Sequence, residues 1–351
     1  MSELRHRKFD GIQALRIVAA LLVLFTHCTY YTWERLDRHF PVWQRGTRGV
    51  DVFFVISGFV MVYSGQKLIR QNEGWKIFAE RRIVRIVPLY WLLTTLKICL
   101  MILAAGLALH AKLSIWTAIA SYLFIPARNL DGKLEPLLAV GWTLNFEMLF
   151  YFVFTLALYL RSNIYQFVGI VLGLLSVGSV LRHPSSSPAT FYLNSIVLEF
   201  FFGMLVARYC ARDVYIPEKI AFCLFGCGCF FLLLPAFETP LPKVLISGIP
   251  AALMIWSAAS LERFHESIPR AVLYLGEASY SIYLVHPFVC PLPPLLMSRA
   301  HVPRPVLAVA ISVLLGLAMG CLVHEFIEVP LSRKLSYMRR ERGQMLARTN
   351  Q

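Results

Sequence analysis

The sequence is poor in charged side chains, and acidic ones are the scarcest. Only 15% of the 351 residues are charged, with 20 aspartates and glutamates against 34 lysines and arginines. By contrast, 58% of the residues are hydrophobic, the mean hydropathy is +0.62, and apolar runs recur along the whole length. No polar linker, soluble domain or low-complexity tract interrupts these runs. This composition indicates an all-α integral membrane protein whose core forms within the bilayer.

Motifs of several enzyme and transporter classes are also absent. The chain has no Gly-x-Ser-x-Gly segment and no Walker loop, which argues against a serine hydrolase and an ATP-driven pump. The eight cysteines lie in or beside apolar segments, and the densest group has no CxxC pair and no accompanying histidine or carboxylate. We therefore expect no metal site and no bound cofactor, and interpret the cysteines as small buried apolar side chains.

The first apolar stretch is not followed by an A-x-A-like cleavage site. We interpret it as a retained membrane span and not as a signal peptide. Residues 1–351 are then expected to form a single transmembrane domain, with residues 335–351 as a basic cytoplasmic tail.

Ten apolar segments are long enough to cross a bilayer. They are residues 12–31, 49–66, 84–107, 141–160, 164–181, 191–208, 219–236, 243–260, 271–292 and 305–326. Residues 108–140 are expected to form an outer loop with a short interfacial helix at 113–126. An even number of crossings puts both chain ends on one side. With that side inside, inner segments hold 21 lysines and arginines and outer segments hold 11, so we predict cytoplasmic termini and set nucleic acid aside as a partner.

The first span contains two ionisable residues, Arg16 and His27. They are eleven residues apart, which at ~100° and ~1.5 Å per residue puts them on one helix face, roughly 16 Å apart. An ionisable group inside a membrane span is energetically unfavourable, so by default it marks a pathway, a partner or a site. The alternative is that Arg16 anchors the inner end of the helix and that His27 hydrogen-bonds a neighbouring helix at the outer interface.

Three other spans bring polar side chains to the outer half of the bundle, near His27. Their segments are GVDVFFVISGF (49–59), GWTLNFEMLFYF (141–152) and GEASYSIYLVH (276–286). The side chains are Asp51 in the first, Trp142, Asn145 and Glu147 in the second, and Ser279, Tyr283 and His286 on one face of the third.

A different group of side chains is expected at the inner surface. The segment RRIVRIVPLYW (81–91) opens the third span with Arg81, Arg82 and Arg85, and helical spacing puts Arg85 on a face with the other two. Arginines at a cytoplasmic helix start suit phosphate groups through paired N–H donors and charge. Binding of anionic lipid head groups is the alternative.

The Arg16–His27 pair and the four segments, taken in chain order as 49–59, 81–91, 141–152 and 276–286, resemble the acyltransferase 3 family of bacterial membrane acyltransferases. The Trp-Thr-Leu-Asn form at 142–145 resembles the exopolysaccharide-acetylating branch of that family. The resemblance implies ten helices in the inner membrane and an acyl-coenzyme A donor, typically acetyl-coenzyme A, that enters from the cytoplasm as co-substrate. It implies a periplasmic sugar hydroxyl of a polysaccharide or lipid-linked glycan as acceptor, and an essential arginine and histidine matching Arg16 and His27. The periplasmic hydrolase-like domain of some relatives has no counterpart in the sequence, so we expect acceptor handling by this domain or by a partner from the polysaccharide synthesis or export machinery.

Acyl transfer to an alcohol needs a base, because a hydroxyl is a poor nucleophile at neutral pH, and His27 is the candidate. A carboxylate would orient its imidazole, and either Asp51 or Glu147 suits this role, although Asp51 could instead cap its helix. Arg16, together with the arginines at 81, 82 and 85, is expected to bind the donor. Because roughly 16 Å is comparable with an extended pantetheine arm, we predict that the Arg16–His27 face lines the donor's channel.

Four residues remain as candidates for acceptor binding or oxyanion stabilisation: Trp142, Asn145, Tyr283 and His286. Membrane-interface aromatics and a structural hydrogen bond from His286 are the alternatives. For the whole chain, the alternative function is a transporter or flippase with an intramembrane His, Glu and Arg relay.

Overall fold

The computed structural model describes residues 9–69, 71–103, 113–183, 186–234, 243–262 and 268–349, the last ten of these without side chains. Its α-helices are α1 (Asp10–Arg35), α2 (Gly49–Gly65), α3 (Gly74–Leu103), α4 (Ile115–Tyr122), α5 (Trp142–Tyr159), α6 (Ile164–Val177), α7 (Leu198–Cys210), α8 (Glu218–Leu233), α9 (Ile249–Leu261), α10 (Arg270–Val289), α11 (Leu292–Arg299), α12 (Pro305–Val323) and α13 (Val329–Thr349). Short turns are η1 (Gln44–Arg48), η2 (Ala139–Gly141), η3 (Gly178–Leu181), η4 (Pro188–Tyr192), η5 (Ser195–Val197), η6 (Val244–Gly248) and η7 (His324–Glu328). Within these ranges the only β pairing is an isolated bridge between Arg128 and Leu134.

The prediction of an all-helical membrane protein is confirmed. Eight helical stretches of the described residues are long and apolar enough to span a membrane, where the sequence predicted ten. The predicted spans at 191–208 and 219–236 instead contain the shorter helices α7 and α8, of 13 and 16 residues. Before α7 the chain forms two separate turns, because the Asn194 side chain accepts a hydrogen bond from the Ile196 N–H and so caps a new helix start.

Helix α3 also differs from its predicted span. It begins at Gly74 and not near residue 84, so the arginines at 81, 82 and 85 lie within the helix and not at its start. A span length counted from apolar residues misses the polar first turns, which continue the same helix outside the apolar run. The helix predicted at 113–126 is present as α4, and it packs on α3 through a hydrogen bond from Trp91 Nε1 to the Tyr122 carbonyl of 2.8 Å.

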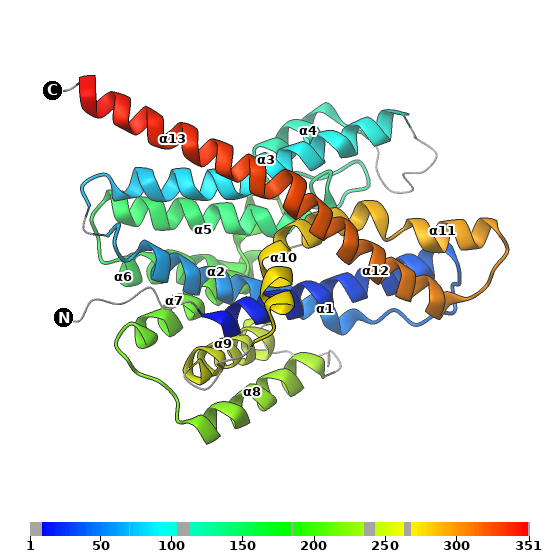
Figure 1. Cartoon of the computed structure of the whole chain (residues 1–351), viewed down its shortest axis with the longest axis horizontal. Helices are drawn as coiled ribbons and strands as arrows, with labels where there is room; N and C mark the ends of the chain where they lie inside the picture. Colours follow the sequence, from blue (N-terminus) through cyan, green and yellow to red (C-terminus); the bar gives the residue numbers. More distant parts are fainter. Residues whose placement is uncertain are drawn as a thin grey trace.

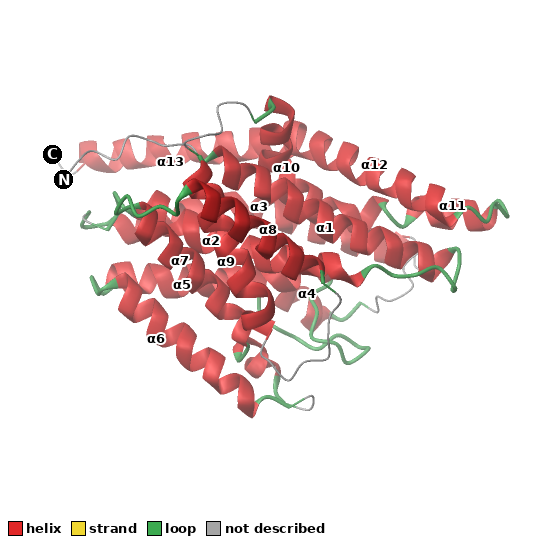
Figure 2. Ribbon diagram, turned by 90° about the horizontal axis from the view of Figure 1, so that it is seen from below, coloured by secondary structure: helices red, strands yellow, loops and turns green. Residues whose placement is uncertain are grey.

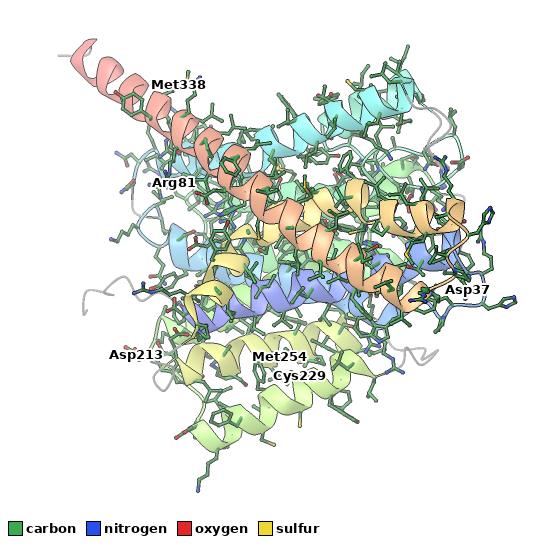
Figure 3. The ribbon with its side chains drawn as sticks, turned by 45° about the vertical axis from the view of Figure 1, so that its right-hand side comes forward. Asp37, Arg81, Asp213, Cys229, Met254 and Met338 are labelled. Carbon is green, nitrogen blue, oxygen red and sulfur yellow. The ribbon has the colours of Figure 1, made fainter. Side chains whose placement is uncertain are left out.

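Helices α1, α2, α3 and α5 run along the long axis of the molecule, and α12 crosses them obliquely (Figure 1). The start of α1 and the end of α13 lie towards the same end of the bundle (Figures 1 and 2), as an even number of crossings requires. Figure 3 places Arg81 and Asp213 towards this end, and Asp37 at the opposite end. We call these the inner end and the outer end. The predicted tail at 335–351 is helical to Thr349 and continues α12 through the π turn η7.

Glycines bring the helix backbones into direct contact. A Cβ atom on Gly58 in α2 would lie 1.9 Å from the Phe200 carbonyl oxygen in α7. Conversely, a Cβ on Gly203 in α7 would lie 1.9 Å from the Val55 carbonyl oxygen in α2. Small residues of this kind allow the close helix approach on which packing in a membrane depends.

Helix α1 is enclosed by α2, α9, α10 and α12. A Cβ on Gly276 in α10 would lie 2.2 Å from the Gln13 carbonyl oxygen of α1. The first turn of α1 is held by the carboxylate of Glu262, which accepts hydrogen bonds from the N–H groups of Asp10 (2.8 Å) and Gly11 (3.0 Å). A carboxylate at this position satisfies N–H groups that have no partner in the helix and complements the helix dipole.

We expect Gly203→Ala to destabilise the protein by about 1–3 kcal/mol, because the added methyl group meets backbone that cannot move aside. The matched control is Gly173→Ala on α6, where a Cβ would meet nothing within 4 Å. This control should be neutral or stabilise the protein by up to about 1 kcal/mol. Thermal unfolding of both variants in detergent measures the difference. Equal midpoints for the two variants would contradict the α2–α7 contact.

Candidate active site

A cavity of about 370 Å³ lies between α1, α2, α3, α5 and α10. Towards the inner end it is lined by Arg16, Arg82 and Arg85. Towards the outer end it is lined by Thr143 and Tyr283. Aromatic and aliphatic side chains form most of the remaining wall, so the cavity combines a cationic inner part with an apolar body.

The three cavity arginines are held in different ways. Arg82 is 8% exposed; its guanidinium donates to Ser64 Oγ at 2.7 Å and lies 5.4 Å from the centre of the Phe78 ring. Arg16 donates to Gln13 Oε1 at 3.2 Å, and the Arg85 side chain is exposed. Arg81, the fourth arginine of the predicted donor site, is exposed and does not line the cavity.

Glu147 lies in the same cavity as the arginines and does not contact His27. Its carboxylate accepts hydrogen bonds from Ser57 Oγ (3.1 Å) and from the hydroxyl of Tyr151, one turn further along α5. The carboxylate is close enough to interact electrostatically with Arg16 and Arg82. Glu147 therefore partly neutralises the cationic end of the cavity.

His27 pairs with a second histidine. Its Nδ1 atom lies 2.7 Å from Nε2 of His286, and the two ring planes are 17° apart with centroids 4.8 Å from each other. His286 is fully buried, whereas His27 is half-buried. This contact joins α1 to α10 at the outer half of the bundle.

The hydrogen bonds of this pair indicate its tautomers. His286 Nδ1 lies 3.3 Å from the Ile282 carbonyl oxygen, which can only accept, so Nδ1 carries the proton in that bond. Nε2 of neutral His286 is then an acceptor, and His27 Nδ1 must donate to it. The lone pair of neutral His27 is therefore on Nε2, the ring nitrogen that does not bond His286 and can accept a proton.

The predicted carboxylate partner of His27 is thus replaced by His286. Asp51 is fully buried; its carboxylate pairs with Lys243 Nζ at 3.2 Å and lies near Glu199. It does not cap α2, whose N-cap residue is Arg48 without a side-chain hydrogen bond. Asp51 faces α7 and η6, so it points away from α1.

Tyr283 separates the cavity from the histidine pair. Its hydroxyl is hydrogen-bonded to Thr143 Oγ1 (3.0 Å) and to the Val140 carbonyl (3.0 Å), and its ring meets the His286 ring edge-on at 6.0 Å. The predicted face of α10 is therefore confirmed, because Ser279 and Tyr283 line the cavity and His286 continues beyond it.

Trp142 and Asn145, like His286, are predicted acceptor residues that lie outside the cavity. Trp142 packs edge-on against Phe54 and Phe146, and Asn145 is buried with its Oδ1 atom lacking a hydrogen-bond partner among the described residues. Neither side chain lines the cavity.

The Arg16–His27 face of α1 does not line one continuous channel. Only its inner part reaches the cavity, through Ile12, Gln13 and Arg16. Beyond Arg16 the backbone of α1 is covered, since a Cβ on Gly49 would lie 2.3 Å from the Ala19 carbonyl oxygen. The outer half of the cavity is consequently formed by α2, α5 and α10.

The sequence reasoning missed several cavity residues, among them Ser57, Tyr151 and Tyr280. Tyr151 follows Glu147 by four residues on a helix, and this spacing is a signal that was available. Tyr280 donates to the Ile86 carbonyl at 2.8 Å, a contact between α10 and α3 that no local pattern contains.

The comparison with known proteins bears on this site directly. Residues 9–325 match the family described as an acyltransferase domain. The chain belongs to this acyltransferase family. The matched range contains every residue that lines the cavity and both histidines. The chain is therefore a multi-pass membrane acyltransferase, as the motifs predicted, and this favours an enzyme over a transporter or flippase.

Two relatives align with this chain over most of both their own length and its length. The exopolysaccharide production protein ExoZ of Rhizobium meliloti (strain 1021) is 34% identical over 313 residues, covering 87% of this chain and 94% of the relative. The acyltransferase MdmB of Streptomyces mycarofaciens is 26% identical over 370 residues, covering 95% and 94%. No solved structure matches the chain.

If His286 orients His27, His286→Leu should lower kcat by at least about 100-fold, with little change in the KM for either substrate. His286→Gln can place an amide oxygen near the position of Nε2 and should recover part of that loss. Steady-state kinetics of purified protein in vesicles, with thermal unfolding as a control for folding, tests this. A merely structural role predicts that activity follows stability and that glutamine does not rescue it.

Proposed function

We propose that this protein is an O-acyltransferase that moves an acyl group, most simply acetyl, from cytoplasmic acyl-coenzyme A to a hydroxyl of an exported or surface polysaccharide. The observation that carries the proposal is a cavity with three arginines at one end and, beyond Tyr283 at the other end, a histidine with its Nε2 lone pair available. The name of the exopolysaccharide relative supports a polysaccharide as acceptor.

The inner end of the cavity suits the nucleotide part of the donor. Coenzyme A carries several phosphate groups, and arginines bind phosphate through paired N–H donors. Arg16, Arg82 and Arg85 line one cavity, so they can act on one ligand. The excess of lysine and arginine in inner segments favours a cytoplasmic inner end, with both termini and the basic tail at 335–351 facing the cytoplasm of the bacterial inner membrane.

The outer end suits the chemical step. His27 Nε2 takes the proton of the acceptor hydroxyl while the hydroxyl oxygen attacks the thioester carbonyl carbon. The resulting imidazolium donates through Nδ1 to His286, which holds the ring in position. Collapse of the tetrahedral intermediate breaks the carbon–sulfur bond, and the leaving thiolate takes the proton from His27. The products are the sugar ester and free coenzyme A, and His27 is again neutral.

Tyr283 is placed for a role between the two ends. Tyr283 lines the outer end of the cavity and its ring meets the His286 ring, so it lies where the thioester carbonyl must arrive. Its O–H donates to the Val140 carbonyl, so Tyr283 can stabilise an oxyanion only if that proton turns from Val140 to the thioester oxygen during the reaction. Trp142 and Asn145 remain predictions for the acceptor side. A partner from the polysaccharide synthesis or export machinery would deliver the acceptor to the outer end.

We expect His27→Ala to lower acyl transfer by about 10²- to 10⁴-fold, because the hydroxyl then lacks its base. The measurement is transfer of radiolabel from acetyl-coenzyme A to cell-surface polysaccharide in membranes. The matched control is His39→Ala, an exposed histidine of the outer loop, which should leave transfer unchanged. Full transfer by the His27 variant would exclude the proposed mechanism.

We expect Arg85→Gln to raise the KM for acetyl-coenzyme A about tenfold, since one charged contact to phosphate is lost. Arg212→Gln removes an exposed arginine outside the cavity and should not change that KM. Arg81→Gln, measured in parallel, decides whether the fourth predicted arginine acts with Arg85. An unchanged KM for the Arg85 variant would place the donor elsewhere.

A further inference from the structure

A second cavity, of about 400 Å³, lies apart from the one described above. It is formed by the connection from α6 to α7, with Leu134 of the loop before α5 at one side. In Figure 2, α6 runs away from the end that carries the termini, so the connection that follows α6 lies farther from that end than the start of α6 does. We call this cavity the outer groove.

The outer groove carries polar groups that the protein itself does not use. Among the described residues, the Arg182 guanidinium, the His183 ring and the Asn194 side-chain NH₂ group form no hydrogen bond, although all three residues line the groove. The Asn194 oxygen is occupied, because it accepts from the Ile196 N–H. The free groups are therefore all able to donate to a ligand.

Arg182 is held in place without being neutralised. Its guanidinium lies 5.9 Å from the centre of the Phe191 ring. Phe191 is only 5% exposed and stacks on Phe146 of α5 with centroids 4.6 Å apart. A cation–π contact fixes a guanidinium but leaves its N–H donors and its charge available.

The charge and shape of the groove indicate the class of ligand. No aspartate or glutamate lines it, so Arg182 gives it a positive charge. Leu134 and Leu193 provide apolar surface beside the serine, threonine and asparagine side chains. Apolar patches with several hydrogen-bond donors fit the C–H face and the hydroxyls of a sugar, and an arginine adds recognition of a carboxylate.

The groove lies a limited distance from the histidine pair. Leu134 lines the groove, and six residues later the Val140 carbonyl accepts the Tyr283 hydroxyl at 3.0 Å. Six residues span at most about 22 Å even when fully extended. A polysaccharide several sugar units long is therefore long enough to lie in the groove and extend to the histidine pair.

We propose that the outer groove binds sugar residues of the acceptor that neighbour the acylated one, and that Arg182 selects an acceptor containing a carboxylate sugar. This inference rests on the proposed function. It predicts that the acceptor is an anionic polysaccharide and that its charge is recognised away from His27.

The test compares two acceptors with full-length protein in vesicles. One is an oligosaccharide that contains a uronate, and the other has the neutral sugar in its place. For wild type, we expect a KM about tenfold lower for the uronate acceptor, and Arg182→Gln should abolish this difference. His183→Ala tests the neighbouring donor, and Arg299→Gln is the control because this exposed arginine lies at the end of α11, outside the groove. The KM for acetyl-coenzyme A should stay unchanged in all variants.

Equal KM values for the two acceptors, or an Arg182 variant that retains the preference, would overturn the groove assignment while leaving the proposed function intact. If neither acceptor is acylated, the proposed function fails for these glycans. Equilibrium dialysis of the radiolabelled uronate oligosaccharide then still tests the groove. Binding that Arg182→Gln weakens and Arg299→Gln does not would support it, and equal binding by wild type and Arg182→Gln would overturn it.

Discussion

The contact between α1 and α10 is the constraint on which the site depends. At the inner end, Gly276 lets the two backbones meet next to Gln13, and further along the helices His27 meets His286 at 2.7 Å. From the other side α12 supports α10, since a Cβ on Gly320 would lie 2.4 Å from Ile282. Helices held by backbone contact cannot rotate independently, so the two rings stay in register. In the proposed mechanism, a base oriented in this way needs no carboxylate partner.

The structure keeps carboxylates away from the histidine pair. Glu147 lies among the cavity arginines, and Asp51 lies with Glu199 and Lys243. Buried charges are stable only when paired or hydrogen-bonded, and each carboxylate here is placed near a cation. The histidine pair is therefore left without a carboxylate neighbour, which suits the uncharged imidazole that the proposed mechanism requires.

In the proposed mechanism the acceptor and the donor have separate entrances. The arginine-lined part of the cavity is at the inner end, whereas the outer groove and the histidine pair are at the outer end. Tyr283 lies between them, bonded to Thr143 and the Val140 carbonyl. An enzyme that joins two substrates from opposite sides of a membrane requires such a closed point, because an open channel would also pass small solutes.

Much of this protein was predictable from residues close together in the chain. The helical class and most spans follow from the length of apolar runs, and the shared face of Ser279, Tyr283 and His286 follows from the helical repeat. The motifs likewise identified the acyltransferase family that the comparison confirmed. These features depend only on local geometry, which spacing in the sequence determines.

The partners across helices were decided only by the tertiary structure. His286 and not a carboxylate meets His27, Asp51 pairs with Lys243, and the Arg16–His27 face is covered beyond Arg16. Each outcome depends on the rotation and separation of two helices, which are set by where glycines admit a neighbouring backbone. A periodic pattern states which residues share a face, but it contains no information on which helix that face will meet.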